Sequence, residues 1–165
     1  ERDRFEKLKE FWATDVAYAL EMGTRPQTLY GIADSPVGLA AWILDHDMVS
    51  YELIARVFDG HSEGLTRDDV LDNITHYWLT NTGISAARIY WENKLGFFDV
   101  KGVSIPVAVS VFPDEIDAVP RSWAERAYPK LIHYNKLDKG GHFAAWEQPK
   151  LLSEEVRAGL RSLRK

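Results

Sequence analysis

The run Val103–Phe112 restricts the fold most, because it is rich in β-branched residues, uncharged, and preceded by a long stretch with helical patterning. Such a run predicts a buried strand rather than a helix. A shorter run, Lys130–Tyr134, predicts a second strand, and residues 120–127 between the two runs predict a helix. The order strand, helix, strand predicts an α/β architecture with parallel strands.

Two strands alone do not make a stable parallel sheet, because such sheets are covered on both faces and need neighbouring strands. We therefore expect the sheet in this chain to be incomplete. The sequence begins Glu1-Arg2-Asp3-Arg4, without an initiator methionine and without the features of a signal peptide. The expectation is that the chain is a piece of a larger protein and that the missing N-terminal half of this protein is its partner.

The first part of the chain, residues 1–95, predicts an almost wholly helical domain, and residues 96–165 predict the part that contains the strands. Ser35-Pro36 is a strong helix start, with serine as N-cap and proline in the first turn. Thr66-Arg67-Asp68-Asp69 resembles a capping box in which aspartate replaces glutamate. The patterning also predicts helices over residues 1–13, 15–22, 51–58 and 84–93, an N-cap at Asp15, a loop over residues 24–28, and an apolar helix face made of Val37, Ala40, Ala41 and Leu44.

The composition excludes several classes of function. The formal net charge of −5 argues against general affinity for nucleic acids or anionic membranes. The chain has no cysteine, which excludes disulfides and thiolate metal sites and fits a cytoplasmic protein. No apolar run approaches the ~18 residues of a membrane span, while a membrane anchor in a preceding region stays open. No metal site is expected, since ligand spacing is lacking among His46, His61, His76 and His133.

The loop Lys139–Pro149 holds His142 behind two glycines and ahead of a helix start. Two consecutive glycines allow backbone angles that are closed to other residues, and proline suits the first turn of a helix. The helix that follows carries an apolar stripe that we expect to pack on the sheet, made of Leu152, Val156, Leu160 and Leu163.

Acidic residues follow the first predicted strand, and His142 follows the second. In open α/β sheets the functional groups lie on loops beyond the carboxyl ends of the strands. A carboxylate bonded to one imidazole nitrogen fixes the tautomer and leaves the other nitrogen as a base, so Asp114, Glu115 or Asp117 could form such a pair with His142. The alternative is a solvated acidic loop and a surface histidine, and the spacing alone leaves both open.

Several motifs in this order carry a resemblance to a known family. The C-terminal ones are Phe112-Pro113-Asp114-Glu115, Pro120-Arg121-Ser122-Trp123, Tyr128-Pro129-Lys130-Leu131 and Gly140-Gly141-His142-Phe143-Ala144-Ala145-Trp146-Glu147-Gln148-Pro149. They resemble the C-terminal part of the microsomal-type epoxide hydrolases, which have the α/β-hydrolase fold. Residues 24–28, 34–43 and 77–78 resemble the helical cap of the same family, and the similarity runs from about residue 14 to the end.

The resemblance implies a fold and a set of roles. The fold is the C-terminal part of an α/β-hydrolase, residues 96–165, with an all-helical cap, residues 1–95. His142 matches the catalytic base, Glu115 the acid that orients it, and Tyr18 and Tyr90 the two cap tyrosines that donate to the epoxide oxygen. The implied reaction opens a small lipophilic epoxide to a diol through a covalent ester, without a cofactor or a metal.

The family's nucleophile, an aspartate on a glycine-rich elbow, has no counterpart in these 165 residues. The chain alone is therefore expected to be inactive. Two alternatives stay open: another cap-bearing hydrolase that attacks carbon, such as a haloalkane dehalogenase, and a non-catalytic helical interaction module. Judged by pattern alone, Tyr18 and Tyr90 are aromatic residues that pack between helices. The sequence is also compatible with a homo-oligomer.

Overall fold

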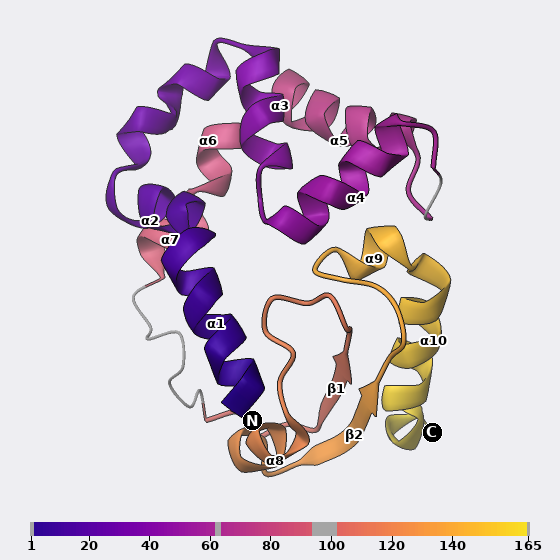
Figure 1. Cartoon of the computed structure of the whole chain (residues 1–165). Helices are drawn as coiled ribbons and strands as arrows, with labels where there is room; N and C mark the ends of the chain where they lie inside the picture. Colours follow the sequence, from indigo (N-terminus) through magenta and orange to yellow (C-terminus); the bar gives the residue numbers. More distant parts are fainter. Residues whose placement is uncertain (1, 62–63, 94–101, 165) are drawn as a thin grey trace. The chain divides into compact units, whose positions relative to one another are not determined.

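The structure, a computed structural model, describes residues 2–61, 64–93 and 102–164 (Figure 1). Residues 10–95 form one compact unit, and residues 1–9 together with 96–165 form the other. The boundary that the sequence predicts at residues 95–96 lies outside the described ranges. None of the helices in these ranges combines the length and apolarity that crossing a membrane requires.

The unit of residues 10–95, here called the helical unit, contains only helices and their connections in its described part. The helix α1 (Arg2–Thr14) contributes its last turn. The others are α2 (Ala17–Thr24), the 3₁₀-helix η1 (Pro26–Ala33), α3 (Pro36–Leu44), α4 (Met48–Phe58), α5 (Arg67–Thr80), α6 (Gly83–Ala86) and α7 (Arg88–Glu92).

The helix starts with strong local signals form as predicted. The Ser35 hydroxyl accepts a hydrogen bond from the Gly38 N–H at 3.0 Å, which satisfies a donor that the first turn of α3 leaves open. At the start of α5, the Asp69 N–H donates to the Thr66 hydroxyl, and the Asp69 carboxylate accepts the Thr66 N–H at 2.8 Å. The capping box with aspartate is thereby confirmed.

Three predictions about the helices and loops of this unit are wrong. Asp15 does not cap α2, because its N–H still bonds to the Phe11 carbonyl at 2.8 Å and so closes α1. The loop expected over residues 24–28 is largely η1, since Pro26 fits the first turn of a helix. The single helix expected over residues 84–93 is split into α6 and α7.

The buried side of α3 also differs from the prediction. Val37, which the expected face includes, is 77% exposed, whereas Leu39 is only 2% exposed. The helix is apolar on nearly all sides, so its residue pattern does not identify the face that packs. A core cluster of this unit consists of Met22, Leu29 and Ala87, with Tyr18, Ile32 and Trp42 packed against it.

The other unit, here called the strand unit, contains a parallel two-stranded sheet, as predicted. Its elements in chain order are β1 (Val107–Val111), α8 (Arg121–Ala127), β2 (Leu131–Lys136), α9 (Ala144–Glu147), α10 (Pro149–Gly159) and the 3₁₀-helix η2 (Arg161–Leu163). The register pairs Ala108 with His133 and Val111 with Lys136. The strand β1 is shorter than the predicted run, and it begins directly after Pro106, which has no N–H to donate to a sheet.

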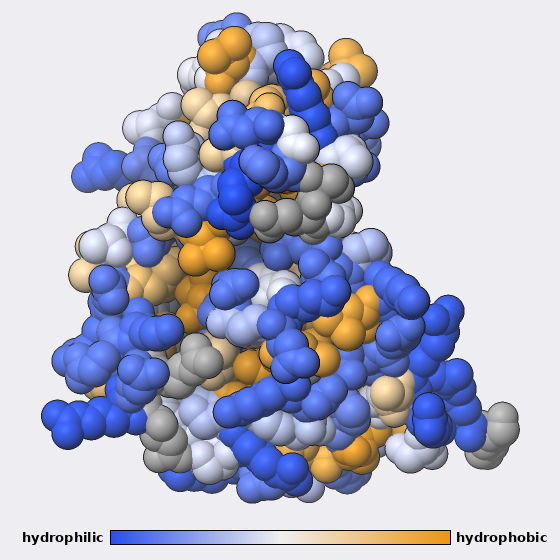
Figure 2. Space-filling view, turned by 45° about the vertical axis from the view of Figure 1, so that its right-hand side comes forward, coloured by the Kyte–Doolittle hydropathy of each residue, from blue (hydrophilic) through white to orange (hydrophobic). Residues whose placement is uncertain are grey.

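Of the apolar stripe predicted for the C-terminal helix, Leu152 is partly buried and the other three residues are exposed. Val156, Leu160 and Leu163 are 52%, 41% and 51% exposed. Exposed apolar side chains also occur elsewhere, and Figure 2 shows separate groups of them on one face of the molecule. The buried side of α10 instead holds Glu155 and Gly159. Gly159 allows a close approach to β1, because a Cβ there would lie 2.8 Å from the Ala108 Cβ.

A polar network ties α10 to both strands. The Glu155 carboxylate accepts hydrogen bonds from the Ser110 hydroxyl at 2.8 Å and the Asn135 amide at 2.9 Å, and it lies 3.1 Å from His133 Nε2. Burial alone would raise the pKa of Glu155, but these hydrogen bonds outweigh burial and lower it. A buried carboxylate with three partners is therefore a stable contact between helix and sheet.

Candidate active site

Two loops follow the carboxyl ends of β1 and β2, and their backbones are joined. The Leu137 N–H donates to the Val111 carbonyl at 2.9 Å, and the Asp114 N–H donates to the Gly140 carbonyl at 3.2 Å. Asp114 and Gly141 also form an isolated parallel bridge. The parallel pairing of the strands therefore continues into the loops and holds the acidic loop beside the histidine loop.

The two glycines of the histidine loop serve different purposes. Gly140 has φ +101°, a backbone conformation that side chains rarely allow, as the sequence predicts. Gly141 is not in that conformation, and its role is close approach. A Cβ on Gly141 would lie 3.2 Å from Glu147 Oε2 and 3.3 Å from the Asp114 carbonyl oxygen, which is tighter than ordinary contact.

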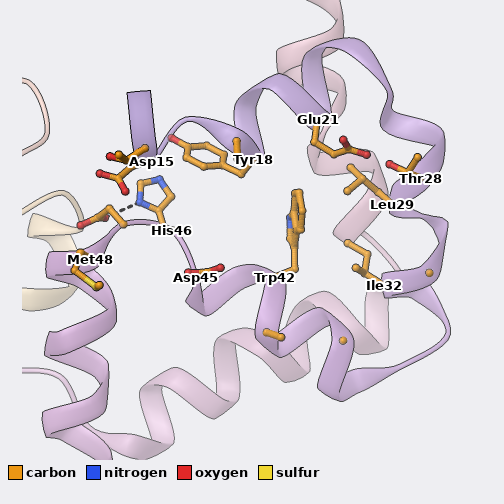
Figure 3. A pocket seen from close by; sticks show the side chains of 16 residues that line it. Asp15, Tyr18, Glu21, Thr28, Leu29, Ile32, Trp42, Asp45, His46 and Met48 are labelled. Carbon is orange, nitrogen blue, oxygen red and sulfur yellow. Dashed lines mark hydrogen bonds and ion pairs between the residues drawn. The ribbon is translucent and has the colours of Figure 1, made fainter. Parts of the chain in front are cut away.

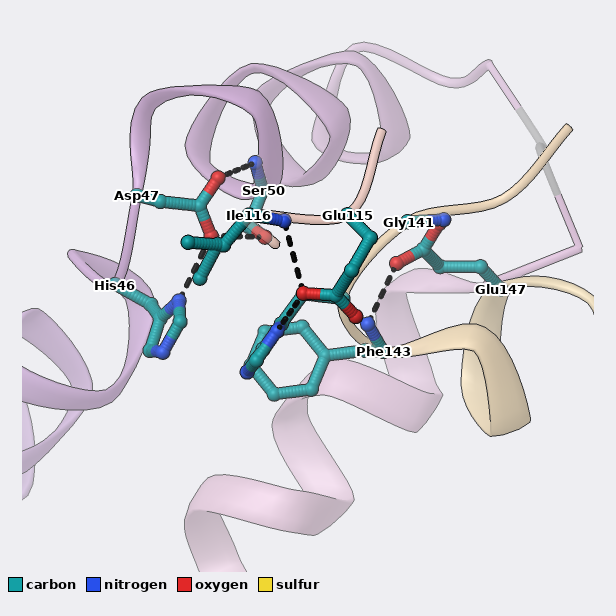
Figure 4. Close-up of polar contacts among 9 residues, drawn as sticks. His46, Asp47, Ser50, Glu115, Ile116, Gly141, Phe143 and Glu147 are labelled. Carbon is teal, nitrogen blue, oxygen red and sulfur yellow. Dashed lines mark hydrogen bonds and ion pairs between the residues drawn. The ribbon is translucent and has the colours of Figure 1, made fainter. Parts of the chain in front are cut away.

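The structure brings His142 and Glu115 together. His142 Nδ1 lies 2.7 Å from Glu115 Oε1, and the two side chains are 35% and 28% exposed. Glu115 Oε1 also accepts the Ile116 N–H at 2.8 Å (Figure 4). The ring of Phe143 meets the His142 ring edge to face, with the centroids 5.0 Å apart. The imidazole is therefore oriented by a carboxylate on one edge and supported by an aromatic ring.

The electrostatics of the acidic loop favour an ionised Glu115. Burial would raise the pKa of Glu115, but the hydrogen bond and charge of His142 and the N–H groups of Ile116 and Asp117 lower it. An ionised carboxylate only accepts hydrogen bonds, so Nδ1 of His142 is the donor in this bond, and in a neutral ring the lone pair then lies on Nε2. Burial, followed by the charge of Glu115, raises the pKa of the neighbouring Asp117.

Glu147, which the sequence analysis did not single out, is buried behind the histidine loop. One carboxylate oxygen accepts the Gly141 N–H at 2.7 Å, and the other accepts the Phe143 N–H at 3.0 Å (Figure 4). The residue is 8% exposed. The sequence signal that could have drawn attention to it is an acidic residue in an otherwise apolar turn ahead of Pro149.

In the helical unit, α2 and α7 bring Tyr18 and Tyr90 together. Their ring centroids lie 6.0 Å apart with the planes nearly perpendicular. Tyr18 packs against the core cluster, and Tyr90 is 37% exposed. The packing agrees with the interpretation from pattern alone, and the donor role that the family resemblance implies for the two hydroxyls stays a prediction.

His46 packs against Tyr18 and is hydrogen-bonded to Asp47, although the sequence analysis considered His46 only as a metal ligand. The His46 ring centroid is 4.7 Å from that of Tyr18, and His46 Nδ1 lies 2.7 Å from Asp47 Oδ2. Asp47 also accepts the Ser50 N–H at 3.0 Å, so it caps α4. Burial opposes ionisation of Asp47, but the hydrogen bonds from His46 and Ser50 lower its pKa to about 2.

A cavity of about 770 Å³ lies within the helical unit, a size in the range of small-molecule sites. In Figure 3, Trp42 stands between Leu29 and Ile32 on one side and Tyr18 and His46 on the other. Asp15, Glu21 and Asp45 supply acidic groups to the same lining. Among the residues that the structure describes, no cluster of histidine and carboxylate side chains could hold a metal ion.

Comparisons with known proteins give one consistent result, although no protein-family model matches the chain. The chain is 48% identical over 151 residues to the "Putative epoxide hydrolase" of Stigmatella aurantiaca (strain DW4/3-1), covering 89% of the chain and 33% of the relative. It is 40% identical over 143 residues to "Epoxide hydrolase 1" of Oryctolagus cuniculus, covering 81% of the chain and 31% of the relative. The crystal structure of juvenile hormone epoxide hydrolase from the silkworm Bombyx mori matches with a TM-score of 0.78 and 26% identity, covering 98% of this chain and 41% of that one. The chain thus spans about a third of the length of the curated relatives that it matches.

Proposed function

We propose that the protein opens a small lipophilic epoxide to a vicinal diol. The proposal starts from the homology of the chain to the epoxide hydrolases, whose α/β-hydrolase fold it shares over its helices and its strands. The helical unit is the lid in this proposal. The strand unit is the C-terminal part of the sheet and supplies the base and its acid. The observation that carries the proposal is the hydrogen-bonded pair of His142 and Glu115 at 2.7 Å.

In the first step a carboxylate attacks an epoxide carbon, the carbon–oxygen bond breaks, and an ester forms. An epoxide has no acidic proton of its own, so opening near neutral pH benefits from a donor at the ring oxygen. Tyr18 and Tyr90 are the proposed donors, since each phenol carries an O–H that can donate a hydrogen bond. The apolar part of the cavity lining, which includes Trp42, suits a lipophilic substrate.

In the second step a water molecule hydrolyses the ester. His142 takes a proton from the water through Nε2 while Glu115 holds Nδ1 and stabilises the imidazolium that forms. The hydroxide equivalent attacks the ester carbonyl, the bond between the carbonyl carbon and the product oxygen breaks, and the His142 imidazolium returns its proton to that oxygen. The second proton of the water leaves the new carboxylic acid, which regenerates the carboxylate, and replaces the proton that a phenol gives to the opened ring oxygen. A general base of this kind contributes on the order of 10²–10⁴ in rate.

The nucleophile of the first step comes, in this proposal, from a segment outside these 165 residues. The relatives are about three times as long as the aligned part, which leaves ample chain for a nucleophile elbow and further strands. Tests of activity therefore require the complete protein.

A haloalkane dehalogenase is the nearest rival, because it also forms an ester on an aspartate under a helical cap. Halide leaving groups are better stabilised by indole or amide donors than by phenols. The pair of tyrosines in the helical unit and the names of the relatives both favour the epoxide reaction.

The proposal is tested by the source of the oxygen in the product. The complete protein, in excess over an aryl epoxide, is allowed one turnover in H₂¹⁸O. We expect a diol without ¹⁸O in that turnover, because its new oxygen comes from the enzyme carboxylate, and a diol with one ¹⁸O after many turnovers. Absence of diol, or direct incorporation of ¹⁸O in the first turnover, would contradict the proposal.

A further inference from the structure

The backbone around His142 is held by a single buried side chain. Gly141 and Phe143, the residues directly before and after the histidine, both direct their N–H groups at Glu147. The two bonds go to different oxygens of the carboxylate, at 2.7 and 3.0 Å. A carboxylate has acceptor sites on both oxygens, so it can satisfy two such donors at once.

The helix α9 places Glu147 where it can do this. The Glu147 N–H donates to the Phe143 carbonyl at 2.9 Å, so the backbone turns back, and the side chain then reaches the N–H groups on both sides of His142. Residues 141–147 thus form a closed loop. The Glu147 N–H bonds to the Phe143 carbonyl, and the Glu147 carboxylate bonds back to the Phe143 N–H. The absence of a side chain on Gly141 lets the Glu147 carboxylate approach this closely.

The burial of Glu147 contrasts with the exposure of the pair that it supports. Glu147 is 8% exposed, whereas the His142 side chain is 35% exposed. Hydrogen bonds that are shielded from water are stronger than exposed ones, so the bonds to Glu147 are well placed to fix the backbone on both sides of the more exposed imidazole. The contacts of the His142 ring with Glu115 and with Phe143 both depend on where the backbone of the histidine loop lies.

We propose that Glu147 is a positioning residue, which holds the backbone of His142 so that Nδ1 meets Glu115 and Nε2 faces the ester. Its consequence for catalysis rests on the proposed function, while its effect on the His142–Glu115 hydrogen bond does not. Small displacements of a catalytic group can cost ~100-fold in rate. Ester hydrolysis, which uses His142, should therefore become slower when Glu147 is changed, and ester formation, which does not use His142, should keep its rate.

The substitution Glu147→Gln separates these steps. Glutamine offers one carbonyl oxygen, and its NH₂ group would face one of the two N–H donors, so only one of the two bonds can be kept. In the complete protein, rapid-quench measurement of single turnovers should show ester hydrolysis slowed about 10- to 100-fold and ester formation changed less than about 2-fold. Glu154→Gln, the same change at an exposed position of α10, should leave both rates unaltered.

A second variant and a spectroscopic signature complete the test. Glu147→Asp keeps the charge but shortens the side chain, and we expect a smaller decrease of about 10-fold in the rate of ester hydrolysis. This variant decides the question if Glu147→Gln does not fold.

The downfield proton resonance of His142 Nδ1–H should be sharp in the parent protein and lost in Glu147→Gln. Equal losses in both chemical steps, or an unchanged resonance, would overturn the proposal. If the parent protein opens no epoxide, the resonance alone decides whether Glu147 positions His142, so the two failures are distinguishable.

Discussion

His142 Nδ1 and Glu115 Oε1 lie 2.7 Å apart although 27 positions separate the two residues in the chain. The parallel pairing of β1 and β2 explains the distance, because the carboxyl ends of parallel strands lie at the same edge of a sheet. The bridge between Asp114 and Gly141 continues this pairing by one step. The pair is thus a direct product of the strand topology.

Replacement of His142 should stop the reaction after its first step. Without the imidazole no group activates water, so His142→Gln in the complete protein should accumulate the ester and lower the rate of its hydrolysis by about 10²–10⁴-fold. Mass spectrometry of the intact protein after mixing with an epoxide would detect the added mass. His61→Gln, at an exposed position of the helical unit, is the control and should turn over normally. Full turnover by His142→Gln would remove the histidine from the mechanism.

Loss of either phenol should act on the other step. Tyr18→Phe and Tyr90→Phe each remove one proposed donor to the ring oxygen, and each should slow ester formation by about 100-fold while ester hydrolysis is unchanged. The double variant should be slower than either single one. Tyr30→Phe, at a position that is 66% exposed, controls for the loss of a hydroxyl. Ester formation that survives both changes would favour the haloalkane dehalogenase hypothesis.

The sequence predicted the helix starts because their signals are local. The hydroxyls of Ser35 and Thr66 satisfy N–H groups only three residues away, and Pro149 fixes its own backbone angle. No knowledge of the rest of the fold is needed for such contacts. The N-cap of α2 was mispredicted, since Asp15 has two local roles open to it, closing α1 or capping α2, and the sequence does not decide between them.

The packing faces of α3 and α10 could not be predicted, because they depend on what lies opposite. Apolar spacing suggested Val156 and Leu160 for α10, yet the strands offer polar groups to Glu155 and space only for a glycine at position 159. Hydrophobic periodicity reports which face is apolar and not which face meets a polar partner.

The pair of His142 and Glu115 in the candidate site was predicted from the sequence, but the role of Glu147, which binds the backbone around His142, was not. The order of the strands allows an acid and a histidine that follow them to meet, and the family resemblance selects Glu115 among the three acids. Glu147 binds backbone N–H groups, which every residue has, so no spacing of side chains indicates its role. His46 and Asp47 are adjacent in sequence, and nothing in the pattern places the His46 ring against Tyr18.

Asp47 should make the helical unit sensitive to acid. Its pKa is about 2 when folded and ordinarily 3.8, so its ionised form stabilises the folded state above pH ~4, and this contribution of about 2 kcal/mol is lost as the pH falls through the folded value. Urea unfolding between pH 5 and pH 2 measures it. Asp47→Asn keeps an N-cap oxygen but has no charge to lose, so its free energy of unfolding should decrease less over this range. Asp59→Asn, exposed at the other end of α4, should behave like the parent protein.

Gly159→Ala should destabilise the strand unit, although alanine normally stabilises a helix relative to glycine. The new Cβ would lie 2.8 Å from the Ala108 Cβ, so α10 must move away from β1, and overpacking of this kind costs about 1–3 kcal/mol. Gly23→Ala in α2 is the matched control: its Cβ would meet only the Tyr90 carbonyl oxygen at 3.8 Å, and the change should be neutral or stabilising by up to about 1 kcal/mol. Adding Ala108→Gly to Gly159→Ala should recover part of the loss, because it removes the atom that the new methyl group meets. Urea unfolding of the parent protein, Gly159→Ala, Ala108→Gly and the double variant gives the coupling energy, and simple additivity of the two changes would show that the two Cβ atoms do not meet.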